Sequence, residues 1–261
     1  MLVLRPGALG DTLLAVPAVR ALRRAFGGVT LAAHSGASRL LQHLGEVEAG
    51  LAFDDPALAW VFGAPHPPTD EQIVAWLSGP RPPALRHTLV FAAGRYDHGH
   101  AAQYLLETLA PLGIDVALDA GPLGVEPRHS DEVLVHPGSG SAAKNWPAER
   151  FAATIRALDG PARLIVGEAD TCAADAVDAA SGRSLPRLSH PSLEELAARL
   201  AGCRAYLGND SGVSHLAGLC GARTVVLFGP TSAETWRPLG PDVQVAGFDA
   251  DPAQLADVLQ T

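Results

Sequence analysis

Short apolar runs alternate with helix-like stretches along most of the chain, and this alternation constrains the fold more than any other feature. The clearest runs of strand character are 1–5, 29–33, 87–92, 132–136, 162–166, 204–208 and 223–228, with weaker ones at 50–53, 185–188 and 242–246. Helical periodicity covers 12–26, 98–111, 148–158, 169–181, 192–202, 212–220 and 251–259. Strands that alternate with helices are typical of parallel sheets covered on both faces, so the sequence predicts an α/β protein.

The segment 120–130 interrupts this alternation. It is rich in Gly and Pro, and the strand–helix pattern restarts after it. A chain of 261 residues is long enough for two domains of roughly 130 residues each. We therefore expect domains over 1–125 and 131–261, joined by a linker. Residues 54–86 are rich in Pro and weakly periodic, which predicts short helices and turns.

Composition narrows the class of protein. Hydrophobic residues make up 48% and charged residues 18%, as in folded globular proteins. The net charge of −9 argues against general nucleic-acid binding, although a small phosphate site needs only local donors. No apolar run reaches membrane-spanning length, and the first residues do not have the layout of a signal peptide. Three cysteines without metal-site spacing fit reduced thiols, so we expect a cytoplasmic protein.

The segment 208–218, which reads GNDSGVSHLAG, carries the strongest functional signal. It follows a predicted strand and opens a predicted helix, so Asp210 or Ser211 is a natural N-cap. Gly212 lets the backbone approach a ligand closely. Unpaired N–H groups at a helix N-terminus attract anions, and a phosphate is the most plausible one. The alternative is a capped helix with a buried His215 and no ligand.

A second glycine-containing loop follows the strand 132–136. Gly138 and Gly140 permit close backbone approach, and Ser139 and Ser141 add hydroxyl donors. Lys144, the only lysine of the chain, can neutralise a leaving diphosphate, whereas a solvated surface lysine is the alternative. Trp146 follows, and we expect it to pack rather than bind.

Two carboxylates follow predicted strands. Asp11 stands after a glycine-bracketed turn at the start of a helix, a position that faces the ligand crevice in open α/β sheets. It could accept a proton from an attacking sugar hydroxyl, or serve only as a helix cap. Glu168 follows the strand 162–166 and could accept hydrogen bonds from ribose hydroxyls, or be a plain helix-start acid.

The first predicted helix, 12–26, carries two further features. Pro17 lies within it, which predicts a kink or a later start. Arg20, Arg23 and Arg24 follow its polar face, and we expect them to be solvated.

Four blocks in this order, 2–23, 135–151, 208–218 and 224–231, resemble glycosyltransferase family 9, the ADP-heptose:lipopolysaccharide heptosyltransferases and their relatives. The resemblance implies the GT-B fold, in which two Rossmann-like domains with parallel sheets face each other across a cleft. Residues 1–125 would be a shortened acceptor-side domain, and 131–261 would bind the nucleotide sugar. Residues 50–100 match the family least.

The resemblance also implies roles for individual residues. Asp11 matches the proposed catalytic base and Lys144 the phosphate- and sugar-binding lysine. Asp210 would bind the donor sugar. The other residues implied at the donor site are Ser139, Gly140, Ser141, Glu168, Ser211, Gly212 and His215. Of these, Glu168 would bind the ribose, the amides of Ser211 and Gly212 would face the diphosphate, and His215 would brace the loop rather than reach a phosphate.

The implied reaction is an inverting transfer of a sugar, a heptose in the family, from ADP-sugar or another nucleoside-diphosphate sugar. The implied acceptor is a glycan or a lipopolysaccharide-type glycolipid, and peripheral contact with the inner membrane surface would suit it. We expect no cofactor and no metal, because the fixed donors can stabilise the leaving diphosphate.

Two other functions remain open. An epimerase of the same fold would bind a nucleotide sugar without an acceptor, and a non-catalytic protein would only bind it. Asp11 argues against the second, because a pure donor-binding protein needs no base in its other domain. A nicotinamide dehydrogenase does not fit, since the first turn lacks Gly-x-Gly-x-x-Gly.

Overall fold

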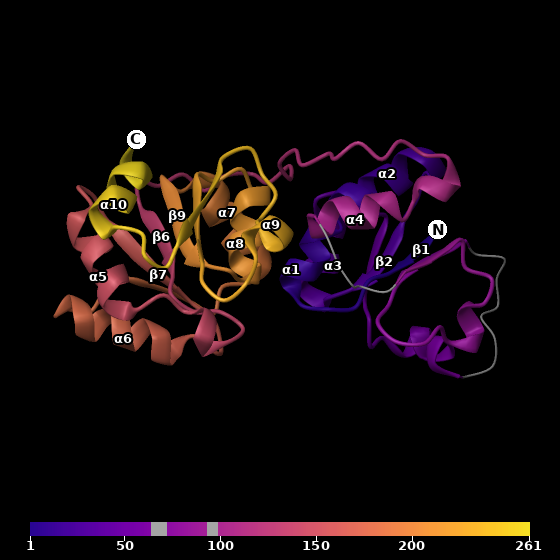
Figure 1. The fold of residues 1–261 in the computed structure, drawn as a ribbon, viewed down its shortest axis with the longest axis horizontal. Helices are drawn as coiled ribbons and strands as arrows, with labels where there is room; N and C mark the ends of the chain where they lie inside the picture. Colours follow the sequence, from indigo (N-terminus) through magenta and orange to yellow (C-terminus); the bar gives the residue numbers. More distant parts are fainter. Residues whose placement is uncertain (64–71, 93–98) are drawn as a thin grey trace. The chain divides into compact units, whose positions relative to one another are not determined.

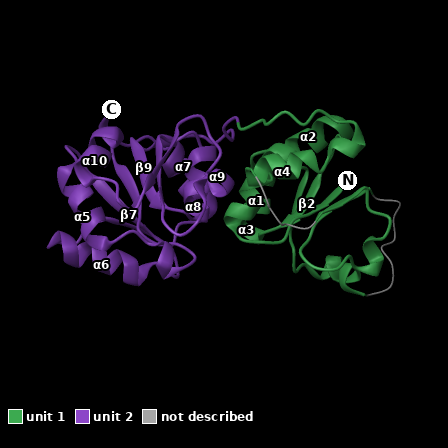
Figure 2. Ribbon diagram, in the orientation of Figure 1, with its two compact units in different colours: residues 1–120 green, residues 121–261 purple. Residues whose placement is uncertain are grey.

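The computed structural model describes residues 1–63, 72–92 and 99–261. The chain divides into two compact units, residues 1–120 and 121–261, coloured separately in Figure 2. Each unit is a parallel sheet flanked by helices, as Figure 1 shows. The chain therefore has the α/β class that the alternating pattern predicts.

The first unit is built on a sheet that has five strands among the described residues, in the order β3-β2-β1-β4-β5, with all pairings parallel. The strands are β1 (Leu2–Leu4), β2 (Thr30–Ala33), β3 (Ala49–Ala52), β4 (Ile73–Trp76) and β5 (Val90–Ala92). The α-helices are α1 (Leu9–Leu14), α2 (Val16–Phe26), α3 (Ser35–His43) and α4 (Ala101–Glu107). Short 3₁₀ helices are η1 (Pro56–Phe62), η2 (Pro83–Leu85) and η3 (Ala110–Leu112).

The two faces of this sheet are covered differently. Leu58 and Val61 of η1, with Leu85 of η2, pack on the face formed by alternate residues of β1 and β4. On the opposite side, α2 and α4 lie next to each other (Figure 1). Trp76 points to this side, because its indole Nε1 donates a hydrogen bond of 2.9 Å to Thr108 just after α4.

The second unit has a sheet with six strands, in the order β11-β10-β9-β6-β7-β8, again with parallel pairings. The strands are β6 (Val133–His136), β7 (Ala162–Val166), β8 (Arg187–Ser189), β9 (Ala205–Asn209), β10 (Thr224–Phe228) and β11 (Val243–Gly247). The α-helices are α5 (Ala148–Ala157), α6 (Thr171–Ser181), α7 (Leu193–Gly202), α8 (Gly212–Leu219), α9 (Ala233–Trp236) and α10 (Pro252–Gln260). A single 3₁₀ turn, η4 (Ala142–Lys144), precedes α5.

Alternation along β6 places one polar side chain on a helix-covered face. Val133 and Val135 join a core that includes Phe151 of α5 and Leu255 of α10. Successive side chains of a strand point to opposite faces, so His136 lies on the other side, against α8. This puts an imidazole at the carboxyl end of a central strand.

Both sheets have a topological switch point. In the first unit the chain runs outward from β1 through β2 to β3 and then returns to β4 on the other side of β1. In the second it runs from β6 through β7 to β8 and returns to β9 beside β6. Ligands of open α/β sheets bind at the carboxyl ends of the strands at such points. The loops after β1, β4, β6 and β9 are therefore where function is expected.

Several local expectations differ from the structure. The region 54–86 contains a strand, β4, as well as turns, and α3 is a further helix that the pattern does not reveal. β4 has four fully buried residues and so shows no polar alternation. The first predicted helix divides at Ala15 into α1 and α2, and Pro17 lies in the first turn of α2, where its missing N–H costs nothing.

The expectation that Arg20 is solvated is wrong. Its guanidinium is largely buried and pairs with Glu46 at 2.5 Å and with Asp119 at 3.2 Å. Arg24 also binds Asp119, at 2.9 Å, while half of its own side chain is exposed. These contacts attach α2 to the segments that follow α3 and η3, so the polar face of α2 has a structural role.

No helix in the described part of the chain combines the length and apolar character needed to cross a bilayer.

Gly50→Ala should destabilise the first unit, because β3 lies directly against α3 there. A Cβ at Gly50 would overlap the backbone carbonyl of Ser38, which cannot rotate away. Overpacking of this kind costs about 1–3 kcal/mol. Gly124→Ala is the control, since a Cβ there meets nothing within 4 Å. In urea denaturation followed by circular dichroism, only Gly50→Ala should shift the midpoint downward. Equal midpoints for both variants would contradict the close packing.

Candidate functional site

Lys144 and Asp210 meet at the switch point of the second sheet. Lys144 Nζ donates to Asp210 Oδ2 at 2.8 Å, and Thr231 Oγ1 donates to the same oxygen at 2.8 Å. Asp210 is only 8% exposed, whereas the lysine side chain is half-buried. The structure thus brings together two residues that the sequence selects from loops 66 positions apart. Thr231 belongs to the fourth sequence block but is not among the residues selected for the site.

Asn209, the last residue of β9, fixes the loop after β6. Its buried side-chain Nδ2 donates to the carbonyl of Pro137 at 2.8 Å, and its Oδ1 accepts from the amide of Trp146 at 2.9 Å. One side chain therefore holds the loop of Lys144 at both ends. Trp146 itself is buried and packs edge-on against Phe151, as expected.

Within that loop, the two serines differ. Ser139 Oγ contacts Asn145 Oδ1 and the carbonyl of Ser141, both at 2.7 Å, so its hydroxyl stabilises the loop. Ser141 and Gly140 are exposed at the loop surface. The loop thus offers a ligand the exposed residues, while Ser139 maintains its shape.

Ser211 occupies the N-cap position of α8, but its side chain makes no capping bond in the described structure. Its Oγ instead lies 3.2 Å from His136 Nδ1. The amides of the first turn of α8 are therefore not covered by a side-chain cap. His215 is buried one turn further along the helix.

A hydrogen-bonded series that sequence reasoning missed supports Ser211. His136 Nε2 lies 3.0 Å from Asp170 Oδ2, and the amide of Gly167 donates to the same carboxylate oxygen at 2.9 Å. Burial opposes the charge of Asp170, but the hydrogen bond and electrostatic attraction from His136, with the amide of Gly167, lower the pKa of the carboxyl. Asp170 also explains Gly138, because a Cβ there would overlap the carboxylate. Of the pair formed by His136 and Asp170, only His136 stands in one of the four sequence blocks, so the sequence pointed only to it.

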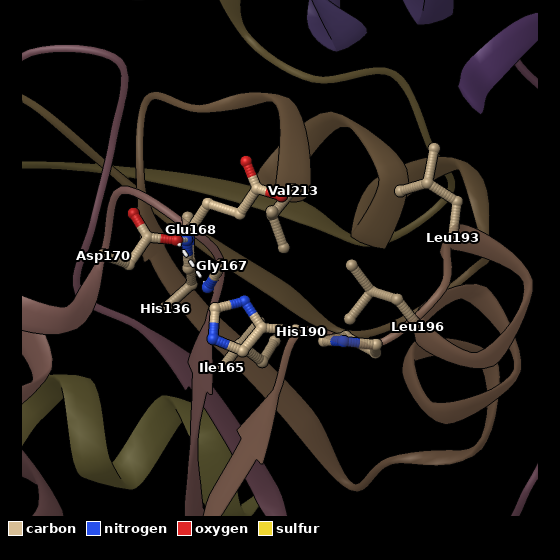
Figure 3. A pocket seen from close by; sticks show the side chains of 10 residues that line it. His136, Ile165, Gly167, Glu168, Asp170, His190, Leu193, Leu196 and Val213 are labelled. Carbon is tan, nitrogen blue, oxygen red and sulfur yellow. Dashed lines mark hydrogen bonds and ion pairs between the residues drawn. The ribbon is translucent and has the colours of Figure 1, made fainter. Parts of the chain in front are cut away.

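A cavity of about 250 Å³ adjoins this series at the ends of β6 and β7 (Figure 3). His136, Asp170 and the exposed Glu168 line one part of it, and Leu193 and Leu196 of α7 line another. His190 also contributes, with a backbone φ of 49°. Such left-handed backbone is uncommon away from glycine and persists where the surroundings enforce it. The cavity combines an apolar wall with a few polar groups, as small-molecule sites do.

Asp11 lies at the switch point of the first sheet. Its Oδ2 accepts from the amide of Ala8, the N-cap of α1, at 3.0 Å. Its Oδ1 accepts from Arg5 Nη2 at 2.9 Å. Arg5 is buried at the end of β1, while 31% of the Asp11 side chain is exposed. Asp11 therefore satisfies the helix start and still presents a carboxylate to solvent, held in position by Arg5.

Among the described residues, no group of three or more His, Cys, Asp and Glu side chains is arranged to hold a metal. Burial raises the pKa of the Cys203 and Cys220 thiols to about 12, so neither is a ready nucleophile.

The two parallel-sheet units and the polar clusters at their switch points define a class of enzyme, the glycosyltransferases of GT-B fold. The model of glycosyltransferase family 9 (heptosyltransferase) matches residues 113–256, more than half of the chain. The chain therefore belongs to glycosyltransferase family 9, whose members transfer a sugar from a nucleotide sugar.

Solved structures show the same fold. ADP-heptose lps heptosyltransferase II of E. coli is 18% identical, with a TM-score of 0.75 over 99% of this chain and 96% of that one. E. coli heptosyltransferase WaaC with ADP is also 18% identical, with a TM-score of 0.75 over 99% and 98%. A family 9 glycosyl transferase from Veillonella parvula is 17% identical, with a TM-score of 0.75 over 94% and 85%. A search of curated proteins finds no match.

Because folding lowers the pKa of Asp170, the free energy of unfolding should decrease at acidic pH. Its pKa is lowered on folding from an unperturbed 3.8, so the unfolded chain takes up the proton first as pH falls. The stabilisation is complete at pH values more than about one unit above 3.8. It is lost as pH falls through the lower pKa that Asp170 has in the folded protein.

Asp170→Asn keeps the shape but removes this titration, so the stability difference from wild type should shrink as pH is lowered from about 6 to 3. Urea denaturation at each pH measures it. Asp131→Asn, at an exposed position, is the control and should follow the wild-type profile. A difference for Asp170→Asn that stays constant with pH would contradict the lowered pKa of Asp170.

Proposed function

We propose that this glycosyltransferase moves a heptose from its ADP-activated form to a hydroxyl of a glycan or glycolipid acceptor, with inversion at the anomeric carbon. The convergence of Lys144, Asp210 and the N-terminus of α8 at one switch point carries the proposal. An ammonium and a set of helix amides suit a diphosphate, whose charge grows as the sugar leaves. The E. coli ADP-heptose lps heptosyltransferase II and the E. coli heptosyltransferase WaaC, solved with ADP, support the choice of donor.

The donor would occupy the second unit. In this proposal the diphosphate lies against the amides of Ser211 and Gly212, and Glu168 accepts hydrogen bonds from the ribose at the rim of the cavity. The adenine of the donor enters the apolar part of the cavity, between Ile165 and the α7 leucines. His136 and Asp170 act as positioning residues, because they orient the Ser211 hydroxyl. Buried His215 braces α8 behind the site.

Lys144 is shared between two anions in this scheme. In the structure Lys144 pairs with Asp210, and the two charges offset each other. When the diphosphate binds, it competes with that carboxylate for the ammonium. Asp210, still held by Thr231, is then available to accept a hydrogen bond from a hydroxyl of the donor sugar.

The acceptor would react at Asp11 in the first unit. The Asp11 carboxylate takes the proton of the acceptor hydroxyl, whose oxygen forms a bond to the anomeric carbon as the bond to the diphosphate breaks. The electron pair leaves with the diphosphate, which Lys144 and the α8 amides stabilise. Arg5 keeps the carboxylate in place. Asp11 belongs to the first unit and the proposed donor site to the second, so transfer requires both units.

Lys144→Ala should weaken the binding of ADP. A charge-assisted contact contributes about 1.5–3 kcal/mol, so affinity should fall roughly ten- to a hundredfold. Isothermal titration calorimetry with ADP measures this directly. Asp210→Asn is the matched control, because it leaves the ammonium and removes a competing negative charge, and it should bind ADP at least as tightly as wild type. Unchanged affinity in Lys144→Ala would refute a phosphate role for the loop.

Asp11→Asn should lose transfer but keep donor binding. Asparagine retains one oxygen, which can still accept from the Ala8 amide, but it loses the ion pair with Arg5 and cannot take a proton. Loss of a general base typically lowers the rate 10²–10⁴-fold. Transfer from ADP-heptose to a lipopolysaccharide core acceptor is assayed beside ADP affinity. Asp115→Asn, which replaces another carboxylate bound to a backbone amide, is the control.

Three outcomes separate the functions. Transfer by Asp11→Asn at the wild-type rate would reduce Asp11 to a helix-stabilising residue. Donor binding without transfer or epimerisation by the wild type would favour the non-catalytic alternative. Epimerisation of the donor without transfer would favour the epimerase.

A further inference from the structure

His136 is buried at the carboxyl end of β6, and both of its ring nitrogens have hydrogen-bond partners. Nε2 lies 3.0 Å from Asp170 Oδ2, and Nδ1 lies 3.2 Å from Ser211 Oγ. An imidazole can be neutral or positively charged near neutral pH. Between a carboxylate and a hydroxyl, its charge decides in which direction the two hydrogen bonds run.

The contact with Asp170 fixes the position of one ring proton. Burial opposes the charge of Asp170, but the hydrogen bond and attraction of His136, with the Gly167 amide, lower the pKa of the carboxyl. The carboxylate is therefore ionised at neutral pH and can only accept hydrogen bonds. Nε2 of His136 carries a proton in either charge state, so a second proton can be added only at Nδ1.

The contact with Ser211 depends on that second proton. The Ser211 hydroxyl has a single proton, which cannot be given to two acceptors. If His136 is neutral, Nδ1 is an acceptor and the serine donates to it. If His136 is charged, Nδ1 donates to Ser211 Oγ, and the serine can give its own proton to a ligand. The charge of His136 thus decides whether Ser211 can donate to a ligand.

The hydroxyls behind Ser211 compete weakly for its proton. Ser214 Oγ donates to the carbonyl of Asn209 at 2.5 Å and lies 2.9 Å from the Tyr206 hydroxyl. Burial raises the pKa of Tyr206, so its hydroxyl keeps the proton that it donates to Ser214. Ser211 Oγ is 3.4 Å from Ser214 Oγ, which is farther than from His136. His136 is therefore the main partner of the Ser211 hydroxyl.

Ser211 stands at the start of α8, where the proposed diphosphate would bind. The amides of Ser214 and His215 donate to the Ser211 carbonyl. The two amides before them, of Gly212 and Val213, have no earlier helix carbonyl to bind. Val213 also lines the cavity shown in Figure 3. An anion at these amides lies beside the Ser211 side chain, so a hydroxyl that donates would bind it and one that offers only lone pairs would not.

We propose that the donor site binds its nucleotide sugar together with one proton, which His136 takes up at Nδ1 and which makes Ser211 a hydrogen-bond donor to the diphosphate. The inference rests on the proposed function, because it concerns the same donor. The proton comes from solvent, and no covalent bond between heavy atoms forms or breaks.

The hydrogen bonds of the series then all run in one direction. Nε2–H of His136 donates to Asp170, Nδ1–H donates to Ser211, and the Ser211 hydroxyl donates to a phosphate oxygen. His136 is a positioning residue, since it acts through Ser211. Its positive charge also helps to stabilise the charge that grows on the diphosphate as the sugar leaves.

Other ionisable groups near His136 could take up a proton instead. On the surrounding elements of the second unit they are Glu168 and Asp170 after β7, His190 after β8, Tyr206 of β9, His215 of α8, and the pair of Lys144 and Asp210. The carboxylates of Glu168 and Asp170 in the cavity wall favour a positive charge on the imidazole. His190, which is exposed in the same cavity wall, and Asp210, which would share Lys144 with the diphosphate, are the two rivals that a test must separate.

The uptake can be counted with ADP-heptose in the absence of an acceptor. Each of its phosphates is linked on two sides and carries one charge, whereas the terminal phosphate of ADP would itself titrate at about pH 6. At about pH 7.5 an ordinary imidazole is roughly nine-tenths neutral. Calorimetry of the full chain at this pH, in buffers of different ionisation enthalpy, gives the number of protons taken up. We expect roughly 0.5–1 proton for each ligand bound, so affinity should rise about three- to tenfold for each unit by which pH is lowered.

Variants identify the group that takes up the proton. His136→Asn should abolish the uptake. Ser211→Ala should at least halve it, and Ser211→Thr, which retains the hydroxyl, should restore it. Because Ser211→Ala leaves the contact of His136 with Asp170 in place, the test does not depend on the folding of His136→Asn. His190→Asn is the matched control and should keep the uptake, as should Asp210→Asn.

Two results would overturn the proposal. One is an uptake of less than about 0.5 proton by the wild type. The other is an uptake that persists in His136→Asn or in Ser211→Ala but disappears in His190→Asn or Asp210→Asn.

The proposed function can fail separately. Binding of ADP-heptose without proton uptake would reject the role of His136 and leave the donor assignment intact. Absence of binding would reject the donor and the proton uptake together. Proton uptake through His136 by a wild type that transfers no sugar would preserve this inference and reject the transferase.

Discussion

The side-chain amide of Asn209 holds the candidate donor site together. By donating to Pro137 and accepting from Trp146, it fixes both ends of a loop that belongs to a different strand. An amide is suited to this position because one end donates and the other accepts. Lys144 can therefore meet Asp210 with little conformational freedom left to lose. Replacing the Asn209 amide by an apolar side chain would leave the Pro137 carbonyl and the Trp146 amide without these hydrogen bonds, and an unpaired buried polar group destabilises the fold.

The sequence predicted the sheet of the second unit well, and for a physical reason. Parallel strands buried on both faces are continuous apolar runs, and β6, β7, β9 and β10 are long enough to show it. β4 is no longer than β6 but lies in a Pro-rich stretch, which concealed it. Arg20 was misjudged because its partners, Glu46 and Asp119, are distant in the sequence, and helical periodicity reports only local exposure.

The candidate site shows the same limit. Lys144 and Asp210 could be selected because each stands in a block with glycines and a strand before it. Asp170 could not, since its meaning depends on contact with His136, 34 positions earlier. Arg5 was likewise seen only as the end of a strand, and its buried pairing with Asp11 required the fold. Candidate ligand-binding residues can be recognised from the glycines and strands next to them in the sequence. Residues that orient those side chains are recognised only from their contacts in the folded structure.

The ion pair of Lys144 with Asp210 has a consequence for the end of a catalytic cycle. The Asp210 carboxylate is held beside the Lys144 ammonium by the fold, so it competes with any bound anion for that ammonium at a high effective concentration. If the lysine holds the departing nucleotide diphosphate, Asp210 can recapture it as soon as the sugar has gone. The spent nucleotide would then dissociate sooner than from an unpaired lysine, and the enzyme would be less prone to inhibition by its own product.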